Sequence, residues 1–126
     1  METAEALFDK ATLVDHYQQV SHYVCPEGYI IWRRGTGNNV ELLNIYTIDH
    51  RKGYGTMLMR EMLKQLKSDP PQEDSIFGFT RMSNPDAIHF YDALGFSLSE
   101  VDGLYEEGIA VFFSTSFNKL SEKLNA

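Results

Sequence analysis

The stretch of sequence that decides the fold is Leu42-Leu43-Asn44-Ile45-Tyr46-Thr47-Ile48-Asp49-His50-Arg51-Lys52-Gly53-Tyr54-Gly55-Thr56-Met57-Leu58. It predicts a largely apolar strand that runs into a short basic turn, and the turn opens directly into a helix. The first turn of a helix has unpaired N–H donors and a partial positive charge, and Gly53 and Gly55 would let an anion approach that backbone closely. The stretch therefore suits a phosphate or a diphosphate, although two glycines by themselves are more often a tight turn that binds nothing.

The glycine pattern excludes two common nucleotide sites. Gly53-x-Gly55 lacks the third glycine of the dinucleotide fingerprint, because Leu58 stands at that position. The sequence also has no Gly-x-x-x-x-Gly-Lys-Ser/Thr segment, which a P-loop requires. The predicted anion site therefore belongs to neither class.

Outward from this stretch, apolar periodicity and turn residues predict the remaining elements. Helical spacing of apolar residues predicts a helix over residues 4–24, which ends before Pro26 and Gly28. The other expected elements are strands over residues 29–34 and 40–48, a helix over 54–67, a strand over 75–81, a helix from Asn84 to Gly95, and strands over 96–101 and 110–117. A strand–helix–strand unit flanked by hairpins predicts an α+β fold, in which helices cover a mixed sheet of five strands.

Length, charge and cysteine content bound the class of protein. The chain has 126 residues, so we expect a single domain over residues 1–126. Eleven basic and 18 acidic residues give a net charge of −7, which argues against nucleic acid as the main partner. No apolar run reaches the ~20 residues that span a bilayer, the first residues do not resemble a signal peptide, and Cys25 is the only cysteine. We therefore expect a cytoplasmic protein without a membrane partner.

Two motifs of the sequence resemble the GCN5-related N-acetyltransferase (GNAT) family. The segment His50–Leu58 resembles the family's acyl-CoA loop, whose signature is Arg or Gln, two residues, Gly, one residue, then Gly or Ala. The segment Asn84–Phe96 resembles the second motif, Asn-x-x-Ala-hydrophobic-x-Phe-Tyr-x-x-x-Gly-Phe. The first signature position holds His50, and the basic residue follows at Arg51. The resemblance covers roughly residues 29–117 and implies a GNAT-like acyl-CoA N-acyltransferase fold that is abbreviated at the N-terminus.

The resemblance also implies where acetyl-CoA, the co-substrate, binds. The cleft would lie between two parallel strands, residues 40–48 and 75–81, with the pantetheine arm paired to the backbone of residues 45–47. Backbone N–H groups of residues 51–56 would hold the diphosphate, and the Asn84 amide would reach the arm, although Asn84 is equally suited to cap its helix. The residues that the resemblance places at the cofactor are Ile45, Tyr46, Thr47, His50, Arg51, Lys52, Gly53, Tyr54, Gly55, Thr56, Asn84 and Tyr91.

Two residues are candidates for acid–base catalysis. The resemblance places Tyr91 beside the thiol, where a phenol could give a proton to the departing thiolate. Without the motif, Tyr91 would be interpreted as a core aromatic. The resemblance places Glu41, at the start of a strand, where some family members have a general base for the attacking amine. An exposed glutamate at a strand end is an equally good interpretation of Glu41.

The sequence therefore predicts an N-acetyltransferase that moves an acetyl group from acetyl-CoA to a primary amine by direct attack. The expected acceptor is a small molecule or a peptide, and a homodimer would cover an open face or edge of the sheet. No metal is expected, because His16, His22 and Cys25 do not have the spacing of a standard metal site. The alternative is a GNAT-like module that binds CoA or a partner and catalyses little or no transfer.

Overall fold

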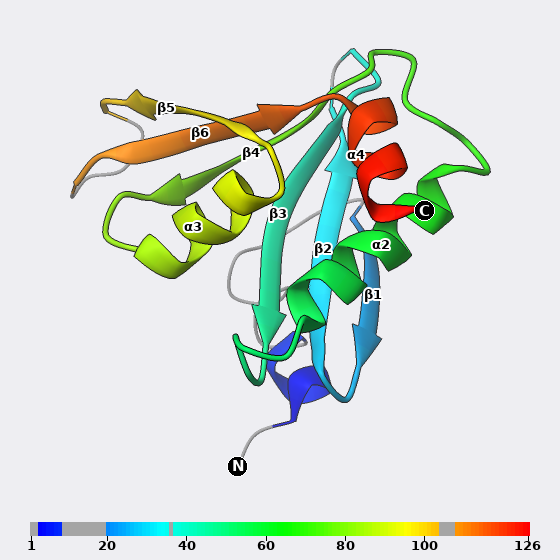
Figure 1. Cartoon of the computed structure of the whole chain (residues 1–126), viewed down its shortest axis with the longest axis horizontal. Coiled ribbons are helices and arrows are strands. Elements are labelled where there is room, and N and C mark those ends of the chain that lie inside the picture. Colours follow the sequence, from blue (N-terminus) through cyan, green and yellow to red (C-terminus); the bar gives the residue numbers. More distant parts are fainter. Residues whose placement is uncertain (1–2, 9–19, 36, 104–107) are drawn as a thin grey trace.

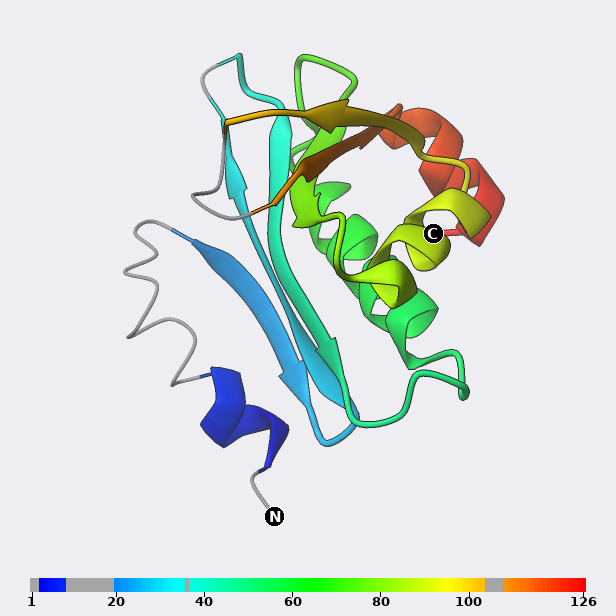
Figure 2. The same cartoon turned by 90° about the vertical axis from the view of Figure 1, so that its left-hand side faces the viewer.

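The computed structural model describes residues 3–8, 20–35, 37–103 and 108–126. Its elements, in chain order, are β1 (Ser21–Cys25), β2 (Gly28–Arg34), β3 (Val40–Thr47), α2 (Tyr54–Leu66), β4 (Ile76–Arg81), α3 (Pro85–Ala93), β5 (Ser97–Val101), β6 (Ala110–Thr115) and α4 (Phe117–Leu124). Helices α2, α3 and α4 lie on one face of the sheet, and a short helical segment over residues 4–8 lies on the other (Figure 1, Figure 2). In this part of the chain, no helix is both long enough and apolar enough to cross a membrane.

The strands form one sheet in the order β1-β2-β3-β4-β6-β5. Neighbouring strands are antiparallel except β3 and β4, which run parallel. The predicted mixed sheet is thus confirmed, and it consists of two antiparallel halves, β1-β2-β3 and β4-β6-β5. The parallel pair joins these halves from Val40↔Ile76 to Leu42↔Gly78, and beyond that point β3 and β4 separate (Figure 1).

Helix α2 packs on the sheet because its apolar residues recur at helical spacing. The buried residues of α2 are Leu58, Met59, Met62, Leu63 and Leu66. The helix begins directly after Gly53, whose φ of 73° is left-handed and is adopted without strain by glycine. This glycine lets the chain turn sharply from the end of β3 into the start of α2.

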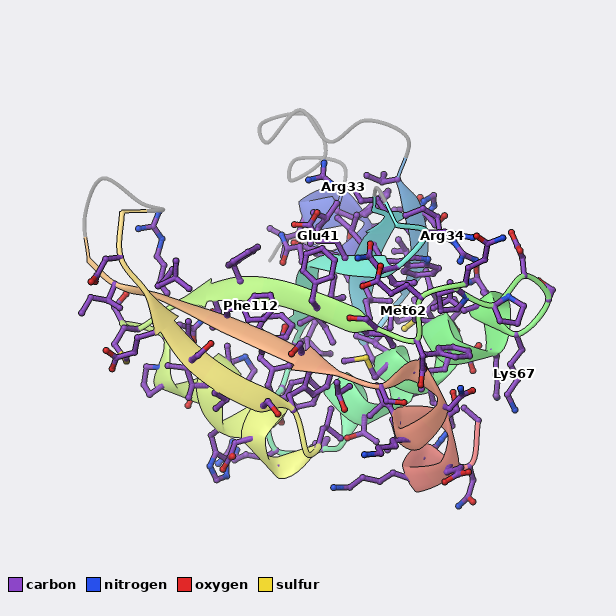
Figure 3. The ribbon with its side chains drawn as sticks, turned by 90° about the horizontal axis from the view of Figure 1, so that it is seen from above. Arg33, Arg34, Glu41, Met62, Lys67 and Phe112 are labelled. Carbon is purple, nitrogen blue, oxygen red and sulfur yellow. The ribbon has the colours of Figure 1, made fainter. Side chains whose placement is uncertain are left out.

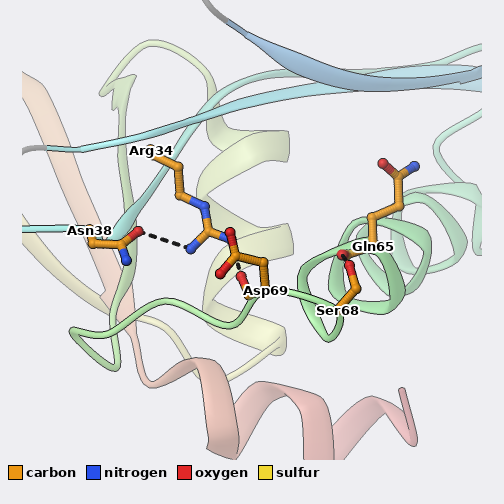
Figure 4. Close-up of polar contacts among 5 residues, drawn as sticks. All are labelled: Arg34, Asn38, Gln65, Ser68 and Asp69. Atoms are coloured by element: carbon orange, nitrogen blue, oxygen red, sulfur yellow. Dashed lines mark hydrogen bonds and ion pairs between the residues drawn. The ribbon is translucent and has the colours of Figure 1, made fainter.

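The connection after α2 is tied to the end of β2 by Arg34 (Figure 4). Arg34 Nη1 donates to Asn38 Oδ1 at 3.1 Å, and Arg34 Nη2 contacts the Asp69 carbonyl oxygen and lies 3.7 Å from Asp69 Oδ2. The Ser68 hydroxyl donates to the carbonyl oxygen of Gln65 at 2.9 Å and so closes the last turn of α2. These contacts hold the chain in place as it leaves α2 for β4.

The structure corrects the prediction for the N-terminal part of the chain. Residues 4–8 are helical as expected, but residues 21–25 form β1, which pairs with β2. The apolar residues of this segment fit helical spacing, yet Tyr23 and Cys25 pack against the core with the alternation of a strand. The predicted helix is therefore wrong over residues 21–24, and the sheet has six strands where five were expected. Residues 9–19 of the predicted helix lie outside the described residues.

A second correction concerns the C-terminal part of the chain. The predicted strand over residues 110–117 ends at Thr115, because Ser116 caps helix α4 and accepts a hydrogen bond from the Lys119 N–H at 3.1 Å. The Asp74 carboxylate accepts from the Ser116 hydroxyl at 2.6 Å and from the Asn118 N–H at 2.9 Å. These bonds, the one from Ser116 foremost, lower the pKa of Asp74. Helix α4 was not predicted, and it packs beside α2.

Candidate functional site

A cleft of about 510 Å³ lies where β3 and β4 separate. One wall is the C-terminal half of β3 with the loop that leads to α2, and the other wall is α3. The lining residues are Ile45, Tyr46, Thr47, His50, Gly55, Asn84, Asp86, Ala87, His89, Phe90, Tyr91 and Ala93. The two motifs identified in the sequence, which are about thirty residues apart, therefore meet across one cleft.

The predicted cofactor residues divide into two groups in the structure. Those that line the cleft are Ile45, Tyr46, Thr47, His50, Gly55, Asn84 and Tyr91, and those that do not are Arg51, Lys52, Gly53, Tyr54 and Thr56. The Arg51 side chain is 91% exposed and lies 3.6 Å from Asp49. The Arg51 N–H already donates to Asp49 Oδ1 at 2.9 Å. The N–H groups of the first turn of α2 have no acceptor within the helix and can donate to an anion.

A local irregularity of the sheet lies where the backbone of β3 becomes exposed to the cleft. The register between β2 and β3 shifts at a point where Ile31 pairs with Asn44 but Trp32 pairs with Leu42, so Leu43 is a bulged residue. The bulge lies next to Leu42, the last residue of β3 that pairs with β4. From Leu43 onward, one edge of β3 faces the cleft and not another strand. A ligand with amide groups can pair with such an edge as a strand would.

Aromatic packing on the far face of the sheet supports this half of β3. The ring of Tyr46 stacks on Tyr29, with centroids 5.5 Å apart, and Phe8 contacts the edge of Tyr29 at 5.8 Å. Residues 4–8 therefore brace the strand from behind, opposite the cleft. This packing holds residues 45–47 in position without occupying the cleft itself.

Gly55 allows the two helices beside the cleft to approach each other. A Cβ at this position would lie 2.8 Å from Cε1 of Phe90 on α3, which is closer than real Cβ atoms come. Gly55 and Phe90 both line the cleft. Gly55, the second glycine of the first motif, is thus required for packing between α2 and α3 as well as for access to the backbone.

Asn84 fulfils the capping role that the sequence left open and also faces the cleft. Its Oδ1 accepts a hydrogen bond from the Ala87 N–H at 3.3 Å, and Pro85 follows at the first position of α3. The capping bond uses the oxygen of the side chain. The amide nitrogen of Asn84 therefore keeps its two protons for a ligand in the cleft.

Tyr91 lies at the inner end of the cleft within an aromatic cluster. Its side chain is 4% exposed, and its ring stacks on Phe113 of β6, with centroids 3.8 Å apart and an interplanar angle of 13°. Phe90 and Phe96 contact the same ring edge-on. Burial raises the pKa of the Tyr91 phenol far above its ordinary value, so the phenol stays protonated throughout the physiological pH range. Tyr91 is thus both a core aromatic and a cleft residue.

Glu41 lies outside the cleft, at the point where the sheet begins to open. Glu41 pairs with Phe77 of β4, and one further pair, Leu42 with Gly78, follows before the two strands separate. Arg33 Nε donates to Glu41 Oε1 at 2.9 Å, Arg33 Nη2 lies at the same distance, and the Glu41 side chain is 17% exposed. Figure 3 shows Arg33 and Glu41 on the side of the sheet away from α3. Glu41 is therefore a half-buried, ion-paired residue and not the exposed strand-end glutamate of the alternative interpretation.

The structure adds residues to the site that the sequence did not single out. Asp86, Ala87, His89, Phe90 and Ala93 line the cleft from α3. Helical spacing from Asn84 and Tyr91 indicates some of these positions, since residues three or four apart share a helix face. Arg33, the partner of Glu41, could not be found in this way, because antiparallel register brings the two together from separate strands.

The comparisons with known proteins agree with this geometry. The sequence model described as the Acetyltransferase (GNAT) family matches residues 26–96, which is more than half of the chain. A comparison with curated protein sequences finds no match. Among solved structures, the chain is similar to a GNAT-family acetyltransferase from Desulfovibrio desulfuricans, with 17% identity, a TM-score of 0.67 and coverage of 88% of this chain and 77% of the other.

Two further structures have the same fold. An acetyltransferase from Bacillus subtilis in complex with CoA is 19% identical, with a TM-score of 0.66 and coverage of 92% and 94% of the two chains. The ribosomal-protein-S18-alanine N-acetyltransferase from Escherichia coli is 18% identical, with a TM-score of 0.64 and coverage of 86% and 76%. At these identities the structural likeness shows the fold alone, and the match to the sequence model of the family stands beside it.

Proposed function

Because the chain belongs to the GNAT acetyltransferase family, we propose that it transfers an acetyl group from acetyl-CoA to a primary amine. The observation that carries this proposal is the cleft between β3 and β4, in which residues from both motifs face each other. A cleft bordered by an open strand edge and a helix N-terminus suits a ligand that has amides at one end and phosphates at the other.

The pantetheine arm would lie along residues 45–47 of β3, where the strand has no partner on β4. The amide nitrogen of Asn84 would donate to this arm from the opposite wall. The diphosphate would lie at the first turn of α2, where the backbone N–H groups and the helix dipole both favour an anion. This placement directs the thioester toward Leu42 and Tyr91, at the closed end of the cleft.

At the closed end, Tyr91 would hydrogen-bond to the sulfur as it leaves. The buried phenol keeps its proton, although burial also makes it a weaker acid. The same apolar surroundings raise the pKa of the departing thiol, so the proton affinities of the two groups move in the same direction. Backbone N–H groups of β3 beside the thioester would stabilise the tetrahedral oxyanion.

The amine would approach from the face of the sheet that carries Glu41, because α3 and the cofactor occupy the other face. A protonated amine must lose a proton before it attacks the thioester, and the Glu41 carboxylate would accept it directly or through water. Arg33 already contacts this carboxylate at 2.9 Å. Glu41 would therefore share its oxygens between Arg33 and the incoming amine, which is a small molecule or a peptide.

Calorimetry with acetyl-CoA tests the cofactor site. We expect micromolar binding to the wild type and no measurable binding to Gly55→Glu, which places a charge and bulk against Phe90. Gln65→Glu is the matched control, because it adds the same charge at an exposed position of the same helix and should bind as the wild type does. Gly55→Ala, without the charge, should bind with intermediate affinity, and thermal unfolding confirms that each variant is folded.

Release of CoA from acetyl-CoA, followed with a panel of small amines and peptides, tests the reaction. Tyr91→Phe retains the ring that stacks on Phe113 and should lower kcat by on the order of 10²-fold with little change in acetyl-CoA affinity. Glu41→Gln should lower turnover as well. Binding without turnover on any amine would favour the alternative function, a module that holds CoA without catalysing transfer. Absence of acetyl-CoA binding to the wild type would contradict the proposal.

A further inference from the structure

A contact between His50 and Asp86 joins the two walls of the cleft. His50 Nδ1 lies 3.5 Å from Asp86 Oδ2. His50 belongs to the loop between β3 and α2, whereas Asp86 is in the first turn of α3, and both residues line the cleft. Their side chains are 64% and 76% exposed, so the pair lies at the solvent-exposed end of the cleft, whereas Tyr91 is buried. A ligand that fills the cleft from end to end must pass this pair.

At this end of the cleft, the described lining side chains carry no positive charge unless a histidine is protonated. Among the described residues, no lysine or arginine lines the cleft, and Asp86 places a carboxylate there. The nearby loop residues are Asp49, Arg51 and Lys52, of which Arg51 faces solvent beside Asp49. The lining side chains that can become cationic are the imidazoles of His50 and His89.

We propose that His50 takes up a proton when the phosphates of acyl-CoA enter the cleft, so that cofactor binding is linked to pH through the His50–Asp86 pair. The inference rests on the proposed function, because it requires the cleft to hold an acyl-CoA. His50 is favoured over His89 for two reasons. It belongs to the loop that leads to the N-terminus of α2, and it already faces a carboxylate whose repulsion of the phosphates it would neutralise.

The direction of the linkage follows from the charges. Imidazole is the side chain whose ordinary pKa, about 6.5, lies in the physiological range, so a nearby anion can change its proton occupancy there. Phosphate oxygens placed beside the ring favour its charged form. The complex therefore binds more protons than the free protein, and acyl-CoA affinity increases as the pH falls from 8 to 6.

Calorimetry in buffers of different ionisation enthalpy measures this proton uptake. Dephospho-CoA is the probe, because it keeps the diphosphate but lacks the phosphate monoester, whose own second pKa of about 6 would contribute a second proton. At pH 7.5 we expect the wild type to take up a measurable fraction of a proton on binding. We expect affinity to be about tenfold higher at pH 6 than at pH 8. Binding weakens by up to tenfold for each pH unit above the pKa of a group that must be protonated in the complex.

Three variants assign the proton to one side chain. His50→Gln should abolish the uptake and bind at pH 6 as weakly as the wild type does at pH 8. His50→Arg carries a permanent charge, so it should also abolish the uptake but bind at pH 8 as tightly as the wild type does at pH 6. His89→Gln is the matched control, because His89 lines the same cleft, and this variant should retain the uptake. All these side chains are exposed, so folding should be preserved.

The outcomes separate this inference from the proposed function. Binding of dephospho-CoA without proton uptake, or uptake that persists in His50→Gln, would show that the inference is wrong while the cofactor cleft stands. Loss of the uptake in His89→Gln alone would also overturn it and would assign the proton to His89. If neither acetyl-CoA nor dephospho-CoA binds at any pH, both the proposed function and this inference fail.

Discussion

Tyr91 combines two roles that usually compete for one side chain. Stacking on Phe113 at 3.8 Å and almost complete burial make its ring part of the core, and the cleft reaches the same side chain. The position of the hydroxyl is therefore set by core packing, and little entropy would be lost when it bonds to a ligand. Because the ring stays packed on Phe113 in Tyr91→Phe, this variant removes the hydroxyl without moving the ring, and its effect on turnover can be assigned to the hydroxyl.

The raised pKa of Tyr91 predicts how stability changes in alkali. An unfolded tyrosine ionises above pH of about 10, whereas buried Tyr91 keeps its proton there, so unfolding releases a proton and rising pH favours the unfolded state. Above that pH the wild type should lose about 1.4 kcal/mol more stability per pH unit than Tyr91→Phe. Urea unfolding of both proteins between pH 8 and pH 11 measures this difference. Parallel stability curves would show that Tyr91 ionises within the folded protein.

At the residue scale, a motif names residue types, and the fold brings several of the residues so named to one cleft. Asn84, Gly55 and Tyr91 were predicted at the site and line the cleft, although their roles toward a cofactor stay predictions. Arg51 and Lys52 were predicted at the diphosphate through their backbone N–H groups as well as their charge, and the Arg51 side chain is exposed beside Asp49. The ion pair between Arg33 and Glu41 depends on the register of two strands, which a sequence does not show before the sheet is known.

At the scale of elements, the two wrong predictions have the same physical origin. Residues 21–25 carry apolar side chains at spacings that fit both a helix and a short strand, and pairing with β2 decides between them. The segment after Thr115 looked like a continuing strand because Phe117 is aromatic, but Ser116 and Asp74 together satisfy the first N–H groups of α4. In both cases the deciding contact comes from outside the element: from the adjoining strand β2 in the first case, and from Asp74, which is distant in the sequence, in the second.

At the scale of elements, Gly78 is the position where the junction between the two halves of the sheet is most tightly packed. A Cβ there would lie 2.4 Å from Cζ of Phe113 and 2.7 Å from the carbonyl oxygen of Leu42. The Phe113 ring can shift, but the Leu42 oxygen belongs to the β3 backbone, so the junction itself would have to open. Gly78→Ala should therefore destabilise the protein by about 1–3 kcal/mol, as measured by urea unfolding.

A control for Gly78→Ala comes from a glycine that faces a side chain. A Cβ at Gly37 would meet the carboxylate end of Glu73, which can move away at little cost. Gly37→Ala should leave stability within about 1 kcal/mol of the wild type. Equal stability of Gly78→Ala and the wild type would mean that β3 and β4 can move apart at the junction to accommodate a methyl group. The site, in contrast, depends on a rigid cleft.

At the scale of the whole molecule, the sheet is divided at the place where the cleft lies. Seven residue pairs join β2 to β3 and six join β4 to β6, but the β3–β4 junction between the two halves has three. Helix α2 contacts the first half, and α3 meets the second through Tyr91 and Phe113. A ligand in the cleft therefore contacts both halves, and it would replace part of the pairing that the separated strands lack.

This division predicts that acetyl-CoA stabilises the molecule as a whole and protects one region in particular. At a concentration 100 times its Kd, a ligand that binds only the folded state adds about 2.7 kcal/mol, which for a chain of this length corresponds to a rise in Tm of roughly 10 °C. Hydrogen exchange should slow most at residues 45–47, where open peptide groups would gain partners, and at the start of α2.

The edge strand β1 and helix α4 lie away from the cleft and serve as internal controls for the exchange measurement. Their amides should be protected only by the overall gain in stability, so the ratio of protection factors between residues 45–47 and β1 should increase on binding. Uniform protection across the sheet would show that acetyl-CoA stabilises the fold without bridging its halves. In that case the ligand would lie elsewhere than along β3, and the open edge of that strand would need another partner, such as a peptide segment that adds a strand.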